Sequence, residues 1–363
     1  MVQHYLQSHR ASLLGQIYRK MAGESIDSLL VTDLAAIRWL TGFSGSNARL
    51  LLAGGAAVLF TDFRYQEQVR RETSGIATVI LRENLARELS SGPWRLGERM
   101  ALQVDHISWH EMQYLSEQLN GRQFHPVRSF FDEFRQLKHI AELQKIRQAV
   151  ACSETVLQEV ISMISPDVTE IDIAAEITYR HRKLGAEKDS FDPIVAGGIR
   201  SAMPHAKPTT AKFEPGSLIV IDMGCMVEGY ASDQTRTVAL GKVPEETRRV
   251  YRIVQRAQQL GIDAARAGIG ARDLDAEVRA FIAAEGFGEA FGHGLGHGVG
   301  VEVHEAPRVG TAGTETLREG MVFTIEPGIY LEGRFGVRIE DMVLLGPDGA
   351  EPLQGFTKDL IEL

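Results

Sequence analysis

Cysteine is scarce in this sequence, which has only Cys152 and Cys225 among its 363 residues. The two lie far apart along the chain, so neither a disulfide framework nor a Cys-x-x-Cys metal or redox motif is predicted. Such scarcity is typical of proteins from a reducing compartment. The N-terminal residues also lack the apolar core of a signal peptide, and we therefore expect a cytoplasmic protein.

The sequence also lacks a long hydrophobic run and a basic block. Its longest uncharged apolar stretch, residues 50–60, contains Gly54-Gly55 at its centre and is much shorter than the roughly 20 residues of a membrane-spanning helix. That stretch is typical of a β-hairpin. No five consecutive Lys or Arg residues occur and the formal net charge is −9, so neither a membrane nor a nucleic acid is expected as a partner.

What the sequence does contain is material for two folded domains. Its 44% hydrophobic and 24% charged residues are close to globular averages, and the chain exceeds one ordinary domain of roughly 100–200 residues. Strand-like segments at 28–32, 50–61 and 78–81 alternate with helical ones before a charged connector. We therefore predict a small α/β domain over residues 1–133 and a second domain over residues 134–363.

The second domain contains an internal repeat. Residues 172–177 recur about 100 positions later as residues 273–278, and a glycine ends the helix of each copy, at Gly185 and Gly286. Each copy follows another helical stretch and precedes a loop rich in glycine and histidine. The pattern favours a pseudo-two-fold domain with a site between its halves. The alternative is a chance similarity of two amphipathic helices.

Four carboxylates follow or connect apolar strands of this second domain. Because a carboxylate on an apolar strand is costly to bury unless it is paired or binds a cation, we expect the four to share a cation. A fifth residue lies in a loop whose five glycines, between residues 292 and 300, leave its imidazole unobstructed. The candidate ligands are Asp222, Asp233, Glu326, Glu340 and His297.

This mostly oxygen-donor set suits Mn²⁺, which we place first, with Co²⁺ or Zn²⁺ as alternatives. Five ligands exceed the three protein ligands of a usual catalytic Zn²⁺ site, whereas two ions about 3.5–4 Å apart accommodate them. Taken singly, each acidic residue could instead be a turn residue, a strand-end cap or part of a solvated acidic pair. Their joint occurrence favours a dinuclear metal hydrolase.

The same residues lie in motifs that resemble the pita-bread metallopeptidases, specifically the Xaa-Pro peptidases that include prolidase and aminopeptidase P. The matching segments are Asp222-Met223-Gly224, Ser232-Asp233-Gln234-Thr235-Arg236-Thr237, Gly294-Leu295-Gly296-His297, Val303-His304-Glu305, Thr324-Ile325-Glu326-Pro327-Gly328 and Val337-Arg338-Ile339-Glu340-Asp341. The first domain is similar to the family's creatinase-like N-terminal domain through residues 39–46 and 61–65. The implied fold is α/β, with a creatinase-like domain followed by a pseudo-two-fold pita-bread catalytic domain.

The resemblance also implies a role for each candidate ligand. Asp222 would bind one of two divalent ions, and His297 and Glu326 would bind the other. Asp233 and Glu340 would bridge the pair.

Further residues receive roles from the resemblance. His205, His293 and His304 would face the substrate, with His293 near its N-terminal residue. Arg338 would orient a metal-bound carboxylate. The implied reaction is hydrolysis of an Xaa-Pro bond by a hydroxide that the two ions activate, with Glu326 as proton shuttle and His304 stabilising the oxyanion.

Arg308 bears on the expected substrate length. Four residues after His304, it could pair with the C-terminal carboxylate of a dipeptide, or it could be a surface arginine or part of a structural ion pair. We favour an Xaa-Pro dipeptidase over an aminopeptidase that acts on longer peptides with proline in second position, and we expect a homodimer. A creatinase-like or methionine-aminopeptidase-like enzyme would share the fold, and so would a catalytically silent binding protein on the same scaffold.

Overall fold

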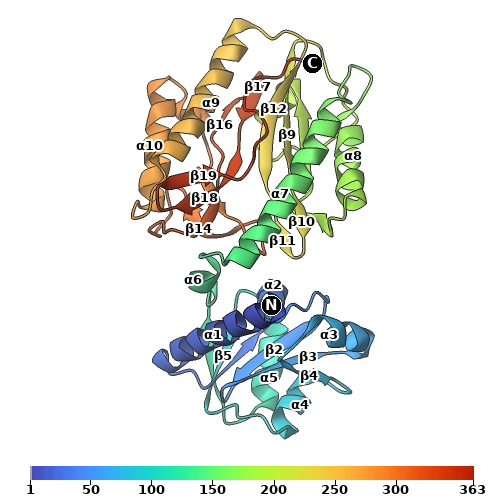
Figure 1. Ribbon diagram of the computed structural model, residues 1–363, viewed down its shortest axis with the longest axis vertical. Helices are drawn as coiled ribbons and strands as arrows, with labels where there is room; N and C mark the ends of the chain where they lie inside the picture. The colour runs from blue at the N-terminus through green and yellow to red at the C-terminus, as the bar shows by residue number, and fades with distance from the viewer. Residues whose placement is uncertain (1) are drawn as a thin grey trace. The chain divides into compact units, whose positions relative to one another are not determined.

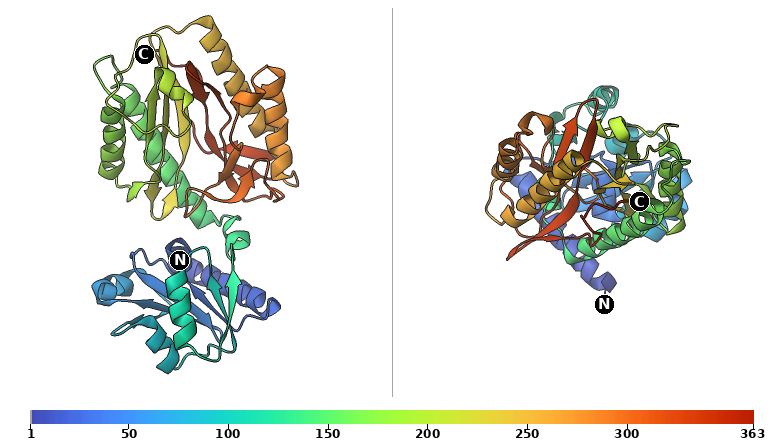
Figure 2. Two further views of the ribbon diagram at one scale, coloured as in Figure 1. Left: turned by 180° about the vertical axis from the view of Figure 1, so that it is seen from behind. Right: turned by 90° about the horizontal axis from the view of Figure 1, so that it is seen from above.

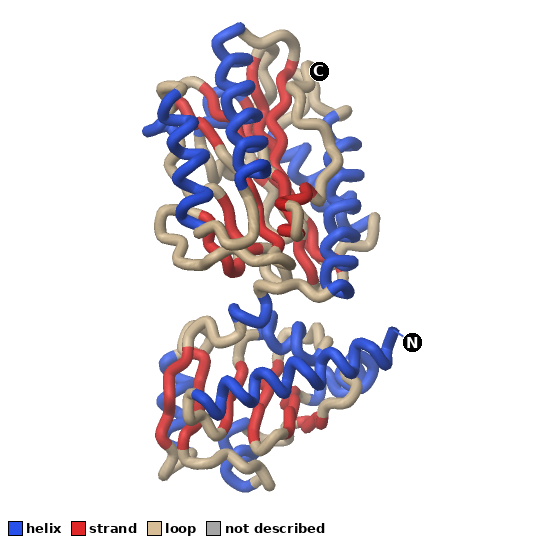
Figure 3. Tube along the Cα trace, turned by 60° about the vertical axis from the view of Figure 1, so that its left-hand side comes forward, coloured by secondary structure: helices blue, strands red, loops and turns tan. Residues whose placement is uncertain are grey.

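The computed structural model describes residues 2–363, with side chains from Arg10 onward. Its contacts divide the chain into two compact units, and the division falls between Phe134 and Arg135 (Figure 1). In each unit, helices flank strands, as the colours of Figure 3 show. Over the described residues, none of the helices combines the length and apolarity needed to cross a bilayer.

The first unit is a six-stranded sheet with helices on both faces. Its strand order is β4-β3-β2-β1-β5-β6. Side chains of β1 alternate between two cores: Leu29 and Val31 pack with α1 and α2, and Leu30 packs with α4 and α5. Because both faces are covered, such strands are apolar at consecutive positions. The elements are β1 (Ser28–Val31), β2 (Ala48–Ala53), β3 (Ala56–Thr61), β4 (Ala77–Ile80), β5 (Arg99–Gln103), β6 (Gln123–Val127), α1 (Val2–Gly23), α2 (Leu34–Thr41), α3 (Gln66–Glu72), α4 (Leu85–Ser91), α5 (Trp109–Gln118) and α6 (Asp132–Arg135), whose last residue, Arg135, belongs to the second unit.

The predicted hairpin is formed by β2 and β3, which are antiparallel with Ala53 opposite Ala56. Gly54 and Gly55 between them have φ values of 57° and 79°. Two consecutive positive φ angles are what a tight hairpin turn of the I′ type requires, and glycine adopts them at little cost. The hairpin prediction for residues 50–60 is confirmed.

The second unit has its strands in the middle and two helix pairs on opposite sides (Figures 1 and 2). On α9, Val250, Val254 and Ala257 form one apolar stripe, which is buried in the same core as Ile325 of β15. The helix pairs are α7 (Ile140–Ile161) with α8 (Glu170–Lys183), and α9 (Glu245–Ala264) with α10 (Ala271–Ala284).

The strands of the second unit form several small sheets. A five-stranded sheet has the order β14-β13-β15-β18-β19, and a three-stranded sheet has the order β12-β9-β8. An isolated bridge between Thr235 and Glu340 joins β12 to the segment before β18, so strand ends from both halves meet. The strands are β7 (Lys188–Asp189), β8 (Ile194–Gly197), β9 (Ser217–Met223), β10 (Cys225–Val227), β11 (Tyr230–Ala231), β12 (Gln234–Leu240), β13 (Gly296–Gly298), β14 (Glu305–Val309), β15 (Val322–Ile325), β16 (Gly328–Leu331), β17 (Phe335–Arg338), β18 (Asp341–Gly346) and β19 (Gly349–Pro352).

The two halves of this unit repeat the same connections. The backbone N–H of Glu170, at the start of α8, donates to the carbonyl of Ala211 (3.0 Å). The N–H of Ala271, at the start of α10, donates to the carbonyl of Glu315 (2.9 Å) in the same way. Equivalent helices are therefore tied to equivalent segments, as expected in a pseudo-two-fold domain.

Candidate metal and substrate site

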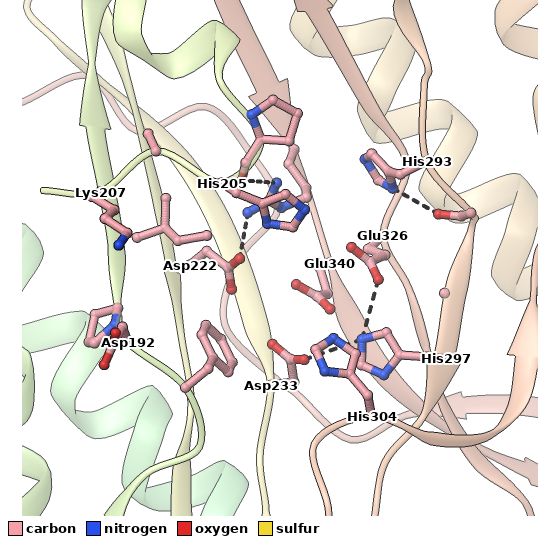
Figure 4. Close-up of a pocket in the computed structure, with 18 of the residues that line it drawn as sticks. Asp192, His205, Lys207, Asp222, Asp233, His293, His297, His304, Glu326 and Glu340 are labelled. Carbon is pink, nitrogen blue, oxygen red and sulfur yellow. Dashed lines mark hydrogen bonds and ion pairs between the residues drawn. The ribbon is translucent and has the colours of Figure 1, made fainter. Parts of the chain in front are cut away.

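The ten residues singled out from the sequence all line one pocket of the second unit, with a cavity volume of about 420 Å³ (Figure 4). They are His205, Asp222, Asp233, His293, His297, His304, Arg308, Glu326, Arg338 and Glu340. Phe191, Pro193 and Ile194 line the same pocket and supply an apolar wall. Folding thus brings together side chains from both halves of the repeat.

Asp222 and Asp233 reach the pocket from neighbouring strands. Asp222 lies in β9 opposite Thr235 of β12, and Asp233 directly precedes β12. At Gly224 a Cβ atom would lie 1.9 Å from the backbone oxygen of Ser232, so only glycine permits this close approach of the two chain segments. Because of this close approach, Asp233 lies beside Asp222. Both carboxylates are buried.

Glu340 and Glu326 come from the other half. The N–H of Glu340 donates to the carbonyl of Thr235 (3.1 Å), and the hydroxyl of Thr235 donates to Oε2 of Glu340 (2.6 Å). Glu326 follows β15, where its N–H donates to the carbonyl of Leu295 (2.8 Å) and its Oε1 accepts from the hydroxyl of Thr324 (3.2 Å). Both carboxylates are therefore oriented by hydrogen bonds.

His297 lies on the short strand β13 between two glycines. A Cβ atom at Gly296 would lie 1.9 Å from the backbone oxygen of Thr324, and one at Gly298 would lie 2.2 Å from that of Ala306. Both neighbouring strands thus pack directly against the backbone of β13. The glycine-rich loop noted in the sequence is needed for this close packing around His297.

Potential ligand atoms converge at the centre of the pocket, as Figure 4 shows. Single atoms of Asp233, His297 and Glu340 lie within 4.8 Å of one another. Nε2 of His297 is 3.5 Å from Oδ2 of Asp233 and 3.4 Å from Oε1 of Glu326. Oδ1 of Asp222 is buried and has no hydrogen-bond partner among the described residues. This set of mostly oxygen donors fits divalent cations.

The electrostatics of the pocket also call for cations. Burial, followed by the charges of neighbouring carboxylates, raises the pKa of Asp233 and Glu340 well above their ordinary values. Burial raises the pKa of Glu326 to about 8, although Arg338 opposes the shift. Burial lowers the pKa of His297 to about 4, so its neutral imidazole can donate a lone pair. Divalent cations would offset the crowded negative charge.

Arg338 is the guanidinium that faces this cluster. Its Nη2 donates to Oδ2 of Asp222 (2.5 Å), its Nε to the hydroxyl of Thr235 (3.0 Å) and its Nη1 to the carbonyl of Pro204 (3.1 Å). The side chain is buried, and three elements hold it in place. One oxygen of Asp222 is thereby fixed by Arg338, and the other remains for a cation.

Tyr330 of β16 belongs to the same network, although it is not among the residues predicted from the sequence. Its hydroxyl accepts from Nη1 of Arg338 (2.8 Å) and lies 3.0 Å from Nε2 of His293. Burial raises the pKa of Tyr330 to about 12, so the phenol stays neutral. Only the strand period after Pro327-Gly328 could have indicated that this side chain faces the pocket, because Tyr330 lies outside the family motifs.

The remaining predicted residues lie at the solvent side of the pocket. His205, His304 and Arg308 are exposed. The rings of His304 and His297 are 4.2 Å apart between centroids. Arg308 forms no ion pair with any described residue, so its guanidinium is available to a ligand.

A buried carboxylate that the sequence did not reveal holds the segment carrying His205. Glu170 accepts hydrogen bonds from the N–H of Gly197 (2.9 Å) and the N–H of Thr209 (3.0 Å), which flank this segment. Nε of Arg200 donates to the same carboxylate (3.0 Å). Glu170 thereby ties together the two ends of the segment that contains His205.

Comparisons with known proteins match both units. A model described as "Metallopeptidase family M24" matches residues 144–347, and one described as "Creatinase/Prolidase N-terminal domain" matches residues 14–137. An Xaa-Pro dipeptidase of Pyrococcus horikoshii is 34% identical over 347 residues, covering 95% of this chain and 97% of that protein.

Solved structures agree with these matches. An Xaa-Pro dipeptidase from Bacillus anthracis superposes with a TM-score of 0.93 at 33% identity, over 97% of this chain and 100% of that one. An X-Pro aminopeptidase from Thermotoga maritima superposes with a TM-score of 0.86 at 36% identity, over 93% and 98% of the two chains.

Proposed function

This chain belongs to metallopeptidase family M24 and carries a creatinase/prolidase N-terminal domain, and from that premise we propose that it hydrolyses Xaa-Pro peptide bonds. The family, the fold and the domain order expected from the sequence are confirmed by these matches. The names of the relatives divide between Xaa-Pro dipeptidases and an X-Pro aminopeptidase. The expected homodimer stays a prediction.

The observation that carries the proposal is the convergence of four carboxylates and a neutral imidazole on one pocket. Membership of the family implies divalent metal ions, and we place Asp222 at one ion and His297 and Glu326 at the other. Asp233 and Glu340 would contact both. Mn²⁺ is the proposed metal, with Co²⁺ or Zn²⁺ as alternatives. When bound, two such ions polarise a carbonyl oxygen and lower the pKa of a water molecule toward neutrality.

The residues of the chain supply the other parts of the reaction. Glu326 takes up a proton at a carboxylate oxygen and passes it to the prolyl nitrogen, which must be protonated to leave. His304 donates a hydrogen bond to the substrate carbonyl oxygen, a contact whose loss typically costs about 10²–10³ in rate. His205 and His293 orient the substrate from other sides of the pocket. The apolar wall around Phe191 accepts the proline ring, whose tertiary amide has no N–H to satisfy.

Chelation tests the proposed function directly. The purified protein is treated with a chelator and then with Mn²⁺, and hydrolysis of Ala-Pro is followed after each step. Activity should disappear and return, whereas a chelator already saturated with metal should have no effect. Hydrolysis that never depends on metal would overturn the proposal. Absence of hydrolysis with Mn²⁺, Co²⁺ and Zn²⁺ alike would favour a silent binding protein.

Arg308 supports the finer proposal of a dipeptidase, because it is exposed at the pocket and unpaired among the described residues. A bond to a charged group is worth about 1.5–3 kcal/mol, and each 1.4 kcal/mol is about tenfold. We therefore expect Arg308→Ala to raise KM for Ala-Pro by about 10–100-fold. It should leave KM for Ala-Pro-Ala nearly unchanged.

The matched control is Arg272→Ala, which removes an exposed arginine outside the pocket lining. This variant should retain both KM values. Initial rates give KM for the dipeptide and the tripeptide. If Arg308→Ala changes both KM values equally, the result would contradict the carboxylate contact and favour an aminopeptidase.

A further inference from the structure

The two cysteines of the chain, remote in sequence, lie in one small core between α7 and β10. Cys225, the first residue of β10, is fully buried, and Cys152 of α7 is partly exposed and packs against the same cluster. Sγ of Cys225 is 3.5 Å from the carbonyl oxygen of Ala149 and 3.4 Å from the hydroxyl of Ser153. Residues 149, 152 and 153 share one face of a helix. Cys152 and Cys225 are therefore neighbours in space.

A buried histidine lies near Cys225. His181 of α8 is fully buried, and its Nδ1 is 2.7 Å from Oδ1 of Asp189. Its Nε2 is also buried and has no hydrogen-bond partner among the described residues. A hydrogen bond from Cys152, together with the charge of His181, lowers the pKa of Cys225 against the effect of burial. The same hydrogen bond, with burial, raises the pKa of Cys152.

We propose that Cys152 and Cys225 form an oxidisable thiol pair, which closes an intramolecular disulfide between α7 and β10 on exchange with a low-molecular-weight disulfide. This inference goes beyond the proposed peptidase activity and does not depend on it. Both cysteines lie in the second unit, so the bond would form within one compact unit.

The exchange takes two displacements. Cys152, the more accessible thiol, first loses its proton to solvent, and its thiolate attacks one sulfur of the small disulfide and releases one thiolate. That thiolate removes the proton from Cys225. Sγ of Cys225 then attacks Sγ of Cys152 and displaces the second thiolate. The second thiolate takes up a proton from solvent, so the protein pair loses two electrons and two protons, and the small disulfide is reduced to two thiols.

Oxidised glutathione provides the test, applied to the metal-loaded, full-length protein. After incubation, free thiols are counted in denaturant and peptides are mapped by mass spectrometry without reduction. We expect both thiols to disappear, a linked peptide pair containing Cys152 and Cys225, and recovery of both thiols on addition of reduced glutathione. Two unreacted thiols, or a stable glutathione adduct on Cys152 without the linked pair, would overturn the proposal.

Single-cysteine variants separate the two displacements. In Cys225→Ser, oxidation should stop at a glutathione adduct on Cys152. In Cys152→Ser, which changes a partly exposed position and should fold normally, the buried Cys225 should stay unmodified. Rapid modification of Cys225 in Cys152→Ser would contradict the assigned order of attack. A band of double mass on a non-reducing gel of the wild type would show an intermolecular bond and overturn the proposal.

Discussion

At the scale of single residues, Asp233 and Glu340 are the carboxylates that lie close both to His297 and to each other. Their shared burial raises the pKa of both, which is costly for an anion unless a cation compensates it. Arg338 is already bound to Asp222, Thr235 and Tyr330. We therefore expect a bound divalent cation to offset the charge of these two carboxylates.

Asp233→Asn and Glu340→Gln should each abolish hydrolysis of Ala-Pro. Each should also lower the number of metal ions bound per chain. Each substitution keeps the shape of the side chain but removes an anionic ligand, so metal affinity should fall by more than about 100-fold. Asp192→Asn is the matched control, because Asp192 lines the same pocket and is exposed. Elemental analysis and initial rates give the two readouts, and full activity in either ligand variant would refute the bridging role.

Tyr330 permits a milder test of the network around Arg338. Tyr330→Phe removes the hydroxyl that contacts Arg338 and His293, at about 0.5–1.5 kcal/mol for each hydrogen bond. We expect kcat/KM for Ala-Pro to fall by about tenfold, with bound metal unchanged. Tyr179→Phe, at an exposed tyrosine of α8, should have no effect. Unaltered kinetics in Tyr330→Phe would show that this hydroxyl does not position the substrate side of the pocket.

At the scale of elements, one buried ion cluster joins the end of α6 to the start of β14. Nη2 of Arg135 lies 2.6 Å from Oε2 of Glu305, and Nζ of Lys138 lies 2.7 Å from Oε1. Burial alone would raise the pKa of Glu305, but Lys138 and Arg135 outweigh it and lower the pKa below its usual value. Because Glu305 directly follows His304, this cluster also fixes the segment that carries that histidine.

Glu305→Gln should lower the free energy of unfolding by about 3–5 kcal/mol at neutral pH, because two cations lose their buried partner. The depressed pKa of Glu305 stabilises the fold above the unfolded value of about 4.3, and this contribution is lost as the pH falls below it. When the pH is lowered from 7 to well below about 4.3, the free energy of unfolding should therefore fall more in the wild type than in the variant. Urea unfolding of the wild type and of Glu305→Gln, at pH 7 and at a pH well below about 4.3, measures this difference.

The control for this cluster is Glu302→Gln. Glu302 contacts the same Arg135 but is 39% exposed, so its loss should cost less than about 1 kcal/mol. Equal stabilities of the Glu305 and Glu302 variants would mean that burial adds nothing to the ion pairs.

At the scale of the whole molecule, each unit has its own hydrophobic core. The candidate metal ligands belong only to the second unit. A ligand that binds the native state stabilises it by about 2.7 kcal/mol at one hundred times its Kd. Metal should therefore stabilise one unit and leave the other unchanged.

Calorimetry should then show two unfolding transitions, of which Mn²⁺ raises the Tm of one. Chelation should reverse the shift, and in Asp233→Asn the shift should be absent because a ligand is missing. A single transition that moves as a whole would contradict independent units. Two transitions whose Tm values do not change when Mn²⁺ is added would contradict the proposed metal centre.

Local chemistry along the chain specifies much of this protein. The strands of the first domain, the hairpin at Gly54-Gly55 and the carboxylates at strand ends can each be recognised from a few neighbouring residues. The repeat is recognised by comparing two segments about 100 positions apart. The motifs around Asp222, His297 and Glu326 were sufficient to identify the family, because the chemistry of metal binding restricts which residues can occupy such positions.

Tertiary packing alone determines which distant residues touch. Strand register, close backbone approach and helix packing produce three such contacts. Tyr330 forms a hydrogen bond with Arg338, Glu305 forms an ion pair with Arg135, and Cys152 packs near Cys225. The sequence pattern does not identify the partner in any of these contacts, because each residue alone is an ordinary strand, connector or core residue. Hydrophobic pattern selects the elements, whereas their packing against one another sets the distances on which a binding site depends.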